Sequence, residues 1–369
     1  MSGRRVVQVL GTSTGGIGTH VASVTRGLLE RGDRVVVIGP QATEDQFGFK
    51  RAGARFIPVE IPTGNDAVAQ GKAVVRLRRL LRGPGGSTPD IVHAHGLRAG
   101  LAARLARPMG SRLVTSWHIH LDTSGGGVKN RLLRETENAV ARGSDVCLCT
   151  DPDQVQVVVA GGGRDVRYAP AAAPALPAST KDADTVKAEL GATGRPVLLS
   201  VGRLHPVKRL DVLIDAAAAW TDLDPMPLVV IAGSGPLEAE LSDHIRRTGA
   251  PVKLLGHRSD MPELLTAADL AVVTSESETR QMFSQETLRA GVPLIATRAG
   301  GIPALVGDAA KLIPPGDPSV LDKTVRELLD SSQARAELAE AGPKQAATWP
   351  TESDTIDQLD ALYRELTGR

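Results

Sequence analysis

The sequence predicts an α/β protein of two domains, each a doubly wound parallel sheet covered by helices on both faces. Apolar runs of strand length alternate with helix-length amphipathic segments along the whole chain. Most of these runs are apolar without alternation, which is typical of parallel strands buried on both faces. The chain has 369 residues, long for a single core, and the strand series restarts after a segment rich in Pro and Ala.

The first domain is expected over residues 1–172, and its strands can be placed in order. RVVQVL forms the first strand over residues 5–10, a helix follows near residues 19–31, and RVVVIG forms the second strand. Three further apolar runs, DIVHAH, RLVTSW and DVCLCT, are separated by amphipathic stretches such as residues 97–107. Buried strands with helices between them predict one Rossmann-like unit.

The second domain is expected over residues 173–350. The segment APAAAPALPAST (residues 169–180) matches neither a strand nor a long helix and is interpreted as a semi-stiff linker. After it the pattern restarts with PVLLSVG, PLVVIAG, VKLLG, DLAVVT and PLIAT. Residues 351–369 contain a last amphipathic helix, which we expect to cross back to the first domain. Two such domains facing each other form a central cleft, and ligands bind at the carboxyl ends of the strands that line it.

Composition limits the classes of function. Hydrophobic residues make up 41% and charged residues 23% of the chain, which is typical of a soluble globular protein. No apolar run approaches the ~20 residues that span a bilayer, and MSGRRVV carries no apolar signal-peptide region. We therefore expect a cytoplasmic protein. Cys147 and Cys149, two apart on a predicted strand, are interpreted as core residues rather than as a redox or metal pair.

The net charge of +1 hides an asymmetry between the two halves. Residues 1–170 hold 23 Lys and Arg against 14 Asp and Glu, a net +9, whereas residues 171–369 hold 20 against 28, a net −8. An anionic partner is therefore expected on the first half, and no nucleic-acid partner is predicted. The predicted helix AVVRLRRLLRG carries four arginines: Arg76, Arg78, Arg79 and Arg82. It is either an ordinary solvated helix or a site of peripheral contact. In the second case its partner is anionic lipid at the inner face of a membrane or a phosphorylated carrier acceptor.

A glycine-rich turn follows the first strand in GTSTGGIGTH. Its spacing does not match the dinucleotide fingerprints, and the second strand ends in Gly39 and Pro40 instead of an acidic residue that would bind a ribose. These mismatches argue against a nicotinamide oxidoreductase. Two interpretations of Gly15 and Gly16 remain at this point: a tight turn into the helix, or an open helix N-terminus that a ligand approaches.

The second half concentrates the candidate chemistry. In SVGRLHPVKRLDVLIDA, Arg203 and Lys208 lie in the loop after a predicted strand. Two cations there suit a diphosphate leaving group, whose developing charge needs neutralising, although surface cations are also common. The segment IAGSGPLEAEL adds a second glycine turn that contains Gly233, a weak signal by itself.

Two glutamates, Glu278 and Glu286, lie eight residues apart around an expected helix start. A carboxylate in the first turn of a helix is favoured by the helix dipole, which is the structural interpretation. The functional one is that backbone N–H groups of the turn bind phosphate while the flanking carboxylates accept hydrogen bonds from hydroxyls.

Taken together, the motifs of the chain resemble those of the retaining, GT-B fold glycosyltransferases of family 4, the group of glycogen synthase and the phosphatidylinositol mannosyltransferases. The motifs that carry the resemblance are GGIGTHV, GRLHPVKRLDVLIDA, GSGPLEAEL, DMPELLTAADLAVVTS and the pair of glutamates that leads to AGVPLIATRAGGIPALV. Their order and spacing match over nearly the whole chain. The resemblance implies a GT-B fold and transfer of a sugar from a nucleoside-diphosphate sugar, with UDP or GDP favoured as the nucleotide. It also implies retention of the configuration at the anomeric carbon, without a metal or other cofactor. The identity of the acceptor stays open.

The resemblance also implies roles for single residues. Arg203 and Lys208 match the cations that bind the donor diphosphate, Glu286 the carboxylate that holds the ribose, and Glu278 the one that faces the transferred sugar. His118, in TSWHIH, matches a histidine beside that sugar. The catalytic residues expected on this basis are His118, Glu278, Arg203 and Lys208; the donor-binding residues are Gly15, Gly16, Arg203, Lys208, Gly233, Arg258 near the base, Glu278, Gln281, Met282, Phe283 and Glu286.

Two departures from the family pattern concern the donor sugar and the hinge. Arg280 and Gln281 stand where the family often has Phe-Gly, and APAAAPA replaces the usual Asn-Gly-Val-Asp after the first domain. Arg280 either points to solvent or pairs with a carboxylate on the transferred sugar. The departures leave one alternative function, a catalytically inactive sugar-nucleotide-binding protein of the same fold.

Histidines end two predicted strands, in HAH (His93 and His95) and HIH (His118 and His120). Such pairs resemble part of a metallohydrolase site, which would also need a bridging acid or lysine and an outer hydrogen-bond partner for each imidazole. Asp122 is the only acidic residue nearby in the sequence. The sequence therefore favours histidines that line the cleft or the core, and no metal site is predicted.

Overall fold

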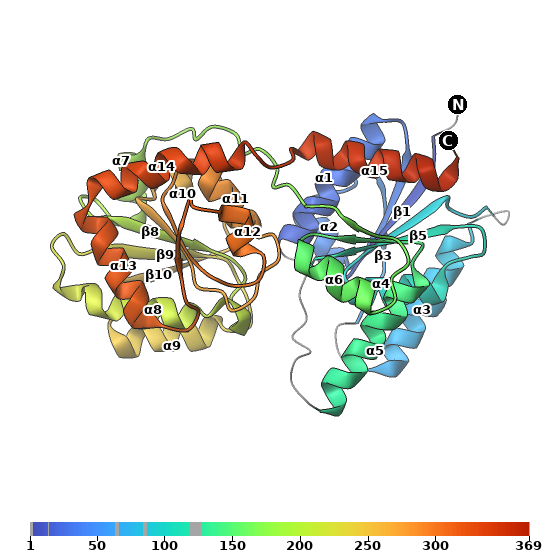
Figure 1. Ribbon diagram of the computed structural model, residues 1–369, viewed down its shortest axis with the longest axis horizontal. Coiled ribbons are helices and arrows are strands. Elements are labelled where there is room, and N and C mark those ends of the chain that lie inside the picture. The colour runs from blue at the N-terminus through green and yellow to red at the C-terminus, as the bar shows by residue number, and fades with distance from the viewer. Residues whose placement is uncertain (1–2, 14, 63–65, 84–86, 119–126, 369) are drawn as a thin grey trace. The chain divides into compact units, whose positions relative to one another are not determined.

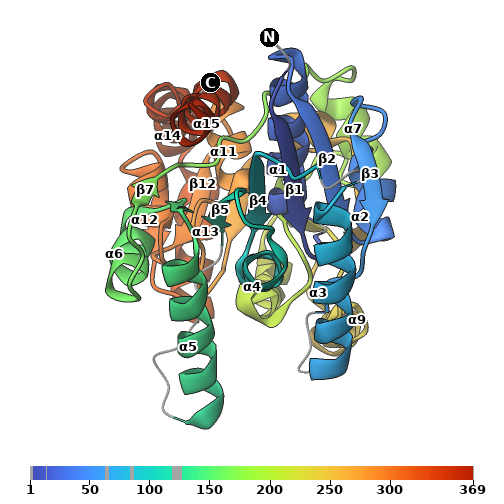
Figure 2. The same cartoon turned by 90° about the vertical axis from the view of Figure 1, so that its right-hand side faces the viewer.

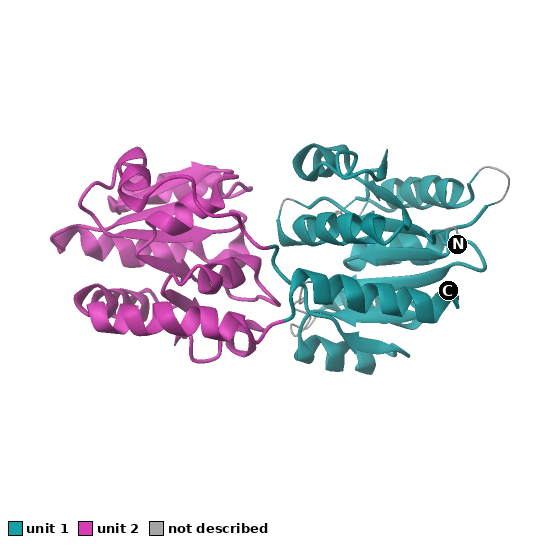
Figure 3. Cartoon of the chain, turned by 90° about the horizontal axis from the view of Figure 1, so that it is seen from above, with its two compact units in different colours: residues 1–174, 350–369 teal, residues 175–349 magenta. Residues whose placement is uncertain are grey.

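The computed structural model describes residues 3–13, 15–62, 66–83, 87–118 and 127–368. The chain divides into two compact units: unit 1 comprises residues 1–174 and 350–369, and unit 2 comprises residues 175–349 (Figure 3). Each unit is a parallel sheet with helices on both faces, so the predicted α/β fold with two doubly wound domains is confirmed.

The described part of unit 1 forms a seven-stranded sheet in the order β3-β2-β1-β4-β5-β6-β7, with every neighbouring pair parallel. Its strands are β1 (Arg5–Leu10), β2 (Arg34–Gly39), β3 (Arg55–Pro58), β4 (Ile91–His95), β5 (Arg112–Trp117), β6 (Val146–Cys149) and β7 (Val166–Tyr168). Its helices are α1 (Gly16–Glu30), α2 (Gln41–Phe47), α3 (Ala67–Leu81), α4 (Leu97–Ala106), α5 (Val128–Gly143), α6 (Pro152–Ala160) and α15 (Glu352–Thr367).

Helix α15 belongs to unit 1 and lies beside α1, although the whole of unit 2 separates the two helices in the sequence (Figure 1). A capping box between Thr351 and Asp354 starts the helix. Its apolar face, including Leu359 and Tyr363, joins the core cluster formed by α1 and one face of the sheet. Gly27 of α1 permits the close approach, because a Cβ there would lie 2.4 Å from the side chain of Ile356.

A buried ion-pair cluster centred on Arg4 joins α15 to the start of β1. The guanidinium of Arg4 donates to both carboxylate oxygens of Asp33, at 3.0 and 2.8 Å, and pairs with Asp360 of α15. It also donates to the backbone oxygen of Asp360 at 3.0 Å. All three side chains are almost fully buried, so each charge depends on its partners.

The described part of unit 2 forms a six-stranded sheet in the order β10-β9-β8-β11-β12-β13, again parallel throughout. Its strands are β8 (Val197–Val201), β9 (Leu228–Ala232), β10 (Val252–Gly256), β11 (Leu270–Val273), β12 (Leu294–Thr297) and β13 (Lys311–Ile313). Its α-helices are α7 (Ala183–Leu190), α8 (Leu210–Ala218), α9 (Glu238–Thr248), α10 (Met261–Ala267), α11 (Met282–Arg289), α12 (Ile302–Val306), α13 (Pro318–Asp330) and α14 (Ser332–Ala346).

The central strand β8 shows why the sequence lacks polar alternation. Val197 and Leu199 pack in the core on one face of the sheet, while Leu198 packs in the core on the other. Because helices cover both faces, each residue of the strand must be apolar whichever way it points.

Both sheets have a point at which the strand order reverses, between β1 and β4 in unit 1 and between β8 and β11 in unit 2. The helices that leave two such neighbouring strands diverge to opposite faces, which opens a crevice at the carboxyl ends of the strands. These two reversal points are therefore where ligand sites are expected.

The structure adds three short strands that the sequence did not predict, β3, β7 and β13. Helix α1 begins at Gly16, three residues before the predicted start near residue 19. The segment 169–178 contains no helix or strand, and the unit boundaries fall within two residues of those expected. Among the described residues, no helix has the length and apolar character needed to cross a membrane.

Candidate functional site

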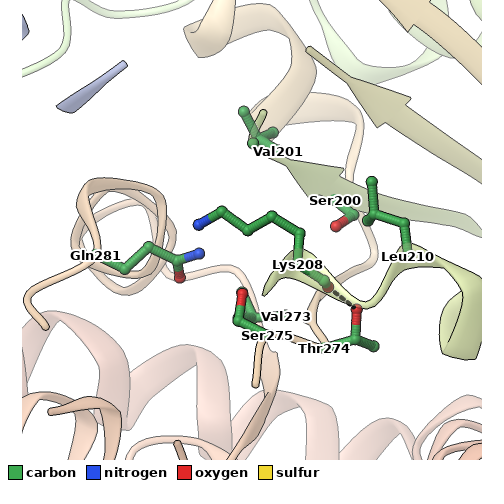
Figure 4. Close-up of a pocket in the computed structure, with 9 residues that line it drawn as sticks. Ser200, Val201, Lys208, Leu210, Val273, Thr274, Ser275 and Gln281 are labelled. Carbon is green, nitrogen blue, oxygen red and sulfur yellow. Dashed lines mark hydrogen bonds between the residues drawn. The ribbon is translucent and has the colours of Figure 1, made fainter. Parts of the chain in front are cut away.

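A small pocket lies at the strand-order reversal of unit 2 (Figure 4). It is bounded by the ends of β8 and β11, the loops that follow them, and the start of α11. Its lining residues are Ser200, Val201, Gly202, Lys208, Leu210, Val273, Thr274, Ser275 and Gln281. The pocket therefore contains two of the predicted donor-binding residues, Lys208 and Gln281.

Lys208 and Glu278 form an ion pair at this pocket. Lys208 ends a short 3₁₀ helix, η2 (Pro206–Lys208), and its Nζ donates to Oε1 of Glu278 in the loop after β11. The hydroxyl of Ser275 also donates to this oxygen at 2.6 Å, and the amide of Gln281 donates to it at 3.1 Å. Three donors on one oxygen hold the carboxylate of Glu278 in a fixed orientation.

The loops after β8 and β11 are joined by further hydrogen bonds. The hydroxyl of Thr274 donates to the backbone oxygen of Lys208 at 2.8 Å, as Figure 4 shows. The backbone N–H of Glu276 donates to the oxygen of Val207 at 2.8 Å. Arg209 follows with a φ of 46° and is the only non-glycine residue with a positive φ in the described part of the chain. A left-handed arginine costs roughly 1–2 kcal/mol, and such strain is characteristic of functional loops.

The same loop carries Arg203, whose side chain is exposed one residue beyond the glycine that lines the pocket. Its positive charge is felt by His205. Burial is the main cause that lowers the pKa of His205, and the charges of Arg203 and Lys208 lower it further. The loop thus presents two cations and a neutral imidazole at the carboxyl end of β8, an arrangement suited to an anion.

Glu286 lies on α11 and is not among the residues that line this pocket. Burial raises the pKa of its carboxyl group from the ordinary value of 4.5 to about 7, and the nearby positive charge of Arg289 opposes the rise. At neutral pH the group is therefore poised between its charged and uncharged forms.

Two glycines of the motif RAGG (residues 298–301) contact the backbone of the loop that contains Glu278. Gly300 has a φ of 50°, and a Cβ on it would lie 2.1 Å from the backbone oxygen of Glu278. The N–H of Gly301 donates to that same oxygen at 2.8 Å. The glycines of this motif thus allow its backbone to approach the backbone of Glu278 closely, and this contact positions Glu278, the residue that pairs with Lys208.

Several predicted donor-binding residues have structural partners of their own. Gly233 has a φ of 147°, a Cβ on it would lie 1.9 Å from the oxygen of Gly202, and its N–H donates to Gly256 at 2.7 Å. Close packing against Gly202, which lines the pocket, therefore requires a glycine at position 233. Phe283 is 4% exposed and its side chain lies in the core, whereas Met282 before it is half-buried at the start of α11.

Two arginines that were predicted near the donor have side-chain contacts within unit 2. Arg258 forms a two-pronged pair with Asp260, its Nε donating at 2.7 Å. Arg280 lies over the ring of Trp349, 5.5 Å from its centroid. This stacking differs from the predicted position in solvent, and pairing with a sugar carboxylate stays a prediction. Its neighbour Gln281 is the side chain that lines the pocket.

The glycine turn of unit 1 leaves the N-terminus of α1 open. Gly15 is the residue before the helix, and both it and Gly16 are exposed. A Cβ at Gly15 would meet no atom of the described residues within 4 Å. By contrast, a Cβ at Gly18 would lie 2.1 Å from the ring of Phe47. Packing explains Gly18 but not Gly15.

Imidazoles cluster at the strand-order reversal of unit 1. His95 ends β4, His118 follows β5, and His20 comes from α1; one ring nitrogen of each lies within 4.8 Å of those of the other two. His95 Nδ1 and His118 Nε2 are 3.1 Å apart, and His95 Nε2 contacts the side-chain oxygen of Gln8 at 2.6 Å. Burial lowers the pKa of His20 to about 4 and the pKa values of His95 and His118 well below 6.5.

His93 completes the cluster but has a structural role. Its Nδ1 lies 2.6 Å from the hydroxyl of Tyr363 in α15, and its Nε2 lies 2.7 Å from the hydroxyl of Ser116. Burial, followed by the repulsion of His20, lowers its pKa to about 3. Of the other residues considered for a metal site, His120 and Asp122 lie outside the described part of the chain.

Sequence reasoning missed three participants. His20 stands four residues after Gly16, and Gln8 lies in an otherwise apolar strand; a buried polar side chain in such a strand is a signal that could have found it. Ser275 directly follows the end of β11 and could have been chosen as a polar residue at the carboxyl end of a central strand.

Comparisons with known proteins cover both units. A family model described as "Glycosyl transferase 4-like domain" matches residues 15–172, and one described as "Glycosyl transferases group 1" matches residues 182–345. Glycogen synthase of Mycobacterium tuberculosis is 27% identical over 391 residues, covering 94% of this chain and 90% of that protein. D-inositol 3-phosphate glycosyltransferase 1 of Catenulispora acidiphila is 29% identical over 401 residues, covering 96% and 91%.

A solved structure shares the architecture as well. Anabaena HepE, determined in complex with UDP-glucose, superimposes with a TM-score of 0.82 at 20% identity, covering 98% of this chain and 100% of that one. At this level of identity the likeness shows the fold.

Proposed function

Because the chain belongs to the GT-B glycosyltransferases of family 4, we propose that it is a retaining enzyme that moves a sugar from a nucleoside-diphosphate sugar to a hydroxyl group of its acceptor. Assignment to this family is based on the two family models and on the curated relatives. The single observation that supports the donor site is the pairing of Lys208 with Glu278 at the strand-order reversal of unit 2.

Donor binding exchanges the partners of this ion pair. The ammonium of Lys208 turns from Glu278 to the diphosphate, and Arg203 adds a second positive charge from the same loop. Glu278, still held by Ser275 and Gln281, then accepts hydrogen bonds from hydroxyls of the transferred sugar. Both changes place charge where the reaction needs it, because the diphosphate gains negative charge as its bond to the sugar breaks.

The remaining donor contacts follow the family pattern. Glu286 holds the ribose hydroxyls, and it does so best when ionised, since a carboxylate accepts stronger hydrogen bonds than a carboxylic acid. Arg258 lies in the loop after β10, which meets the base through its backbone. The complex of HepE with UDP-glucose supports UDP as the first nucleotide to test.

Retention follows from attack on the leaving-group face of the sugar. The bond between the anomeric carbon and the diphosphate oxygen breaks, the acceptor oxygen bonds to the same face of that carbon, and the acceptor proton passes to the departing phosphate. No side chain forms a covalent intermediate. Arg203, Lys208 and helix N-termini supply the positive charge, so we propose that no metal or organic cofactor takes part.

Unit 1 contributes the acceptor side of the reaction. His118 lies beside the transferred sugar in this proposal, and Gly15 and Gly16 leave the start of α1 accessible to the donor phosphates or the acceptor. That a Cβ at Gly15 would meet no described atom within 4 Å supports this role.

A sugar-nucleotide-binding protein without activity is the alternative, and one observation favours it: Glu278 is already occupied by three donors. A thermal-shift screen with UDP-, GDP-, ADP- and dTDP-sugars identifies the donor, because a ligand of the native state raises the melting temperature by mass action. Release of free nucleotide from the stabilising donor, in the presence of candidate acceptors, then supports the enzyme. Stabilisation without nucleotide release supports the binding protein.

A further inference from the structure

The histidine cluster of unit 1 has the composition of a transition-metal site. His20, His95 and His118 come from α1, the end of β4 and the residue after β5, and they meet at the reversal of strand order in that sheet. The ring centroids of the three pairs are 5.3 to 5.9 Å apart. Imidazole is a favoured ligand of Zn²⁺ and of its first-row neighbours.

The distances between the ring nitrogens are close to those of a metal-bound triad. Nitrogens 2.0–2.1 Å from a tetrahedral Zn²⁺ lie about 3.3 Å from one another. His95 Nδ1 and His118 Nε2 are 3.1 Å apart. One ring nitrogen of His20 lies within 4.8 Å of one ring nitrogen of each of the other two histidines, so a movement of about 1.5 Å suffices to reach the spacing of a metal-bound triad.

Gln8 prepares His95 as a ligand. The Nε2–H of His95 donates to the side-chain oxygen of Gln8 at 2.6 Å, which leaves the lone pair on Nδ1, the atom that faces His118. A hydrogen bond of this kind on the far nitrogen is the usual outer support of a metal-bound histidine. Ligation by His118 Nε2 moves its proton to Nδ1, a change of tautomer without a change of charge.

His93 is not part of the site, because both of its nitrogens already have partners in Tyr363 and Ser116. Its ring lies 4.2 Å from that of His95, centroid to centroid, and fills the space behind the cluster. Among the residues that the structure describes, the site therefore has three protein ligands, the number found in zinc sites that keep a fourth position for an exchangeable ligand.

We infer that His20, His95 and His118 bind one divalent transition metal ion, with Zn²⁺ as the ion of first choice. The inference extends to activity and there rests on the proposed function. A metal on the nitrogen of His118 withdraws that side chain from the transferred sugar, so Zn²⁺ inhibits sugar transfer rather than supporting it.

Metal binding is measured first, on the full chain freed of metal with a chelator and then dialysed. Equilibrium dialysis with Zn²⁺ followed by elemental analysis is expected to give one ion per chain. Co²⁺ serves as the spectroscopic probe, because its visible absorption reports the geometry and the nitrogen ligands. His20→Gln and His118→Gln are each expected to weaken binding by at least about 10²-fold, and Gln8→Leu, which removes only the outer support, by about 10- to 100-fold.

The matched control is His244→Gln, a half-buried histidine of α9 that pairs with Asp215 in unit 2. It is expected to bind Zn²⁺ as the unchanged protein does. Melting curves of all variants verify that unit 1 stays folded. Inhibition by Zn²⁺ is then measured against the metal-free rate of each protein, and is expected to fade in His20→Gln.

The inference is overturned if the unchanged protein binds less than about a tenth of an equivalent of Zn²⁺, or if folded His20→Gln and His118→Gln retain its affinity. In the first case the three imidazoles are a hydrogen-bonded cluster only. Failure of the proposed function has a different signature, since the absence of sugar transfer leaves the binding measurement intact.

Discussion

Lys208 and Glu278, seventy positions apart in the chain, pair their charges where β8 and β11 end side by side. Each residue depends on the other, since only about a fifth or less of either side chain is exposed. In the function proposed above, a diphosphate that attracts Lys208 frees a lone pair of Glu278 for a hydroxyl of the transferred sugar. On that proposal, the ion pair couples recognition of the phosphates to recognition of the sugar.

Glu286 is expected to make donor binding depend on pH. Its pKa of about 7 means that the carboxyl group loses its proton between about pH 6 and 8, and the ionised form binds ribose hydroxyls better. Donor affinity is therefore expected to rise with pH across this range in the unchanged protein. Titrations of the chosen donor at pH 6 and 8 measure the rise; a Glu286→Gln variant, which cannot ionise, is expected to show little of it.

The same group has the opposite effect on stability. Its pKa is higher in the folded protein than the ordinary 4.5, so the folded state holds the proton more tightly. The resulting stabilisation is full below about pH 4.5 and is lost as the pH rises through about 7. Urea unfolding of unit 2 at pH 5 and pH 8 measures it. An equal dependence on pH in Glu286→Gln would show that other groups are responsible.

Gly15 is expected to serve a ligand rather than the fold. Because a Cβ there meets no described atom within 4 Å, Gly15→Ala is expected to keep the melting temperature and to lower the rate of sugar transfer by crowding the open start of α1. Gly71→Ala is the control: its Cβ also meets nothing described within 4 Å, and it lies inside α3, where alanine is the better helix former. Unchanged transfer in Gly15→Ala would remove the glycine turn from the site.

Asp360 and Asp357 offer a matched pair of substitutions on α15. Asp360 is buried against Arg4, whereas Asp357 pairs with Arg31 and is 61% exposed. Asp360→Ala leaves a buried arginine with one partner fewer and is expected to cost about 3–5 kcal/mol of unfolding free energy. Asp357→Ala is expected to cost less than about 1 kcal/mol. Denaturant unfolding measures both; equal costs would show that the Arg4 cluster does not fasten α15.

Helix α3 is either an ordinary solvated helix or a contact with anionic lipid, and vesicle binding distinguishes the two. Arg76 and Arg79 are exposed on it beside the exposed Val68 and Val75, and Arg78 is used differently, donating to the oxygen of Leu105 at 2.5 Å. In the second case, sedimentation with phosphatidylglycerol vesicles is expected to show binding that weakens at high salt and in Arg76→Glu with Arg79→Glu. Arg247→Glu on α9 is the control. Absence of salt-sensitive binding makes α3 an ordinary solvated helix.

The fold was predictable where a single physical requirement shaped the sequence. Central strands such as β8 are apolar because both of their faces are buried, and a run of that kind is visible without the structure. The edge strands β3, β7 and β13 have three or four residues and exposed positions, so their sequences RFIP, VRY and KLI do not differ from those of loops. Pairing with a neighbour creates them, and pairing cannot be seen in the strand itself.

The site was predictable as a set of residues but not as a set of contacts. Lys208 and Glu278 were chosen separately, and only the adjacency of β8 and β11 brings them together. Arg280 was considered a candidate because of its position in the sequence beside Gln281. Its stacking on Trp349 could not be predicted, because Trp349 lies sixty-nine positions later in the chain. His20 was missed because nothing in its helix indicates that α1 begins beside the end of β4.

The central claim is that Glu278 acts on the transferred sugar while Glu286 holds the nucleotide, and steady-state kinetics of the two alanine variants test it most directly. Contacts with the sugar can strengthen as charge develops at the anomeric carbon, whereas contacts with the ribose are equal before and during the reaction. Glu278→Ala is expected to lower kcat by on the order of 10²-fold with little change in donor KM, and Glu286→Ala mainly to raise donor KM. Melting curves establish first that both variants are folded. If both folded variants transfer sugar with the kcat and KM of the unchanged protein, the donor site is not where Lys208 and Glu278 meet.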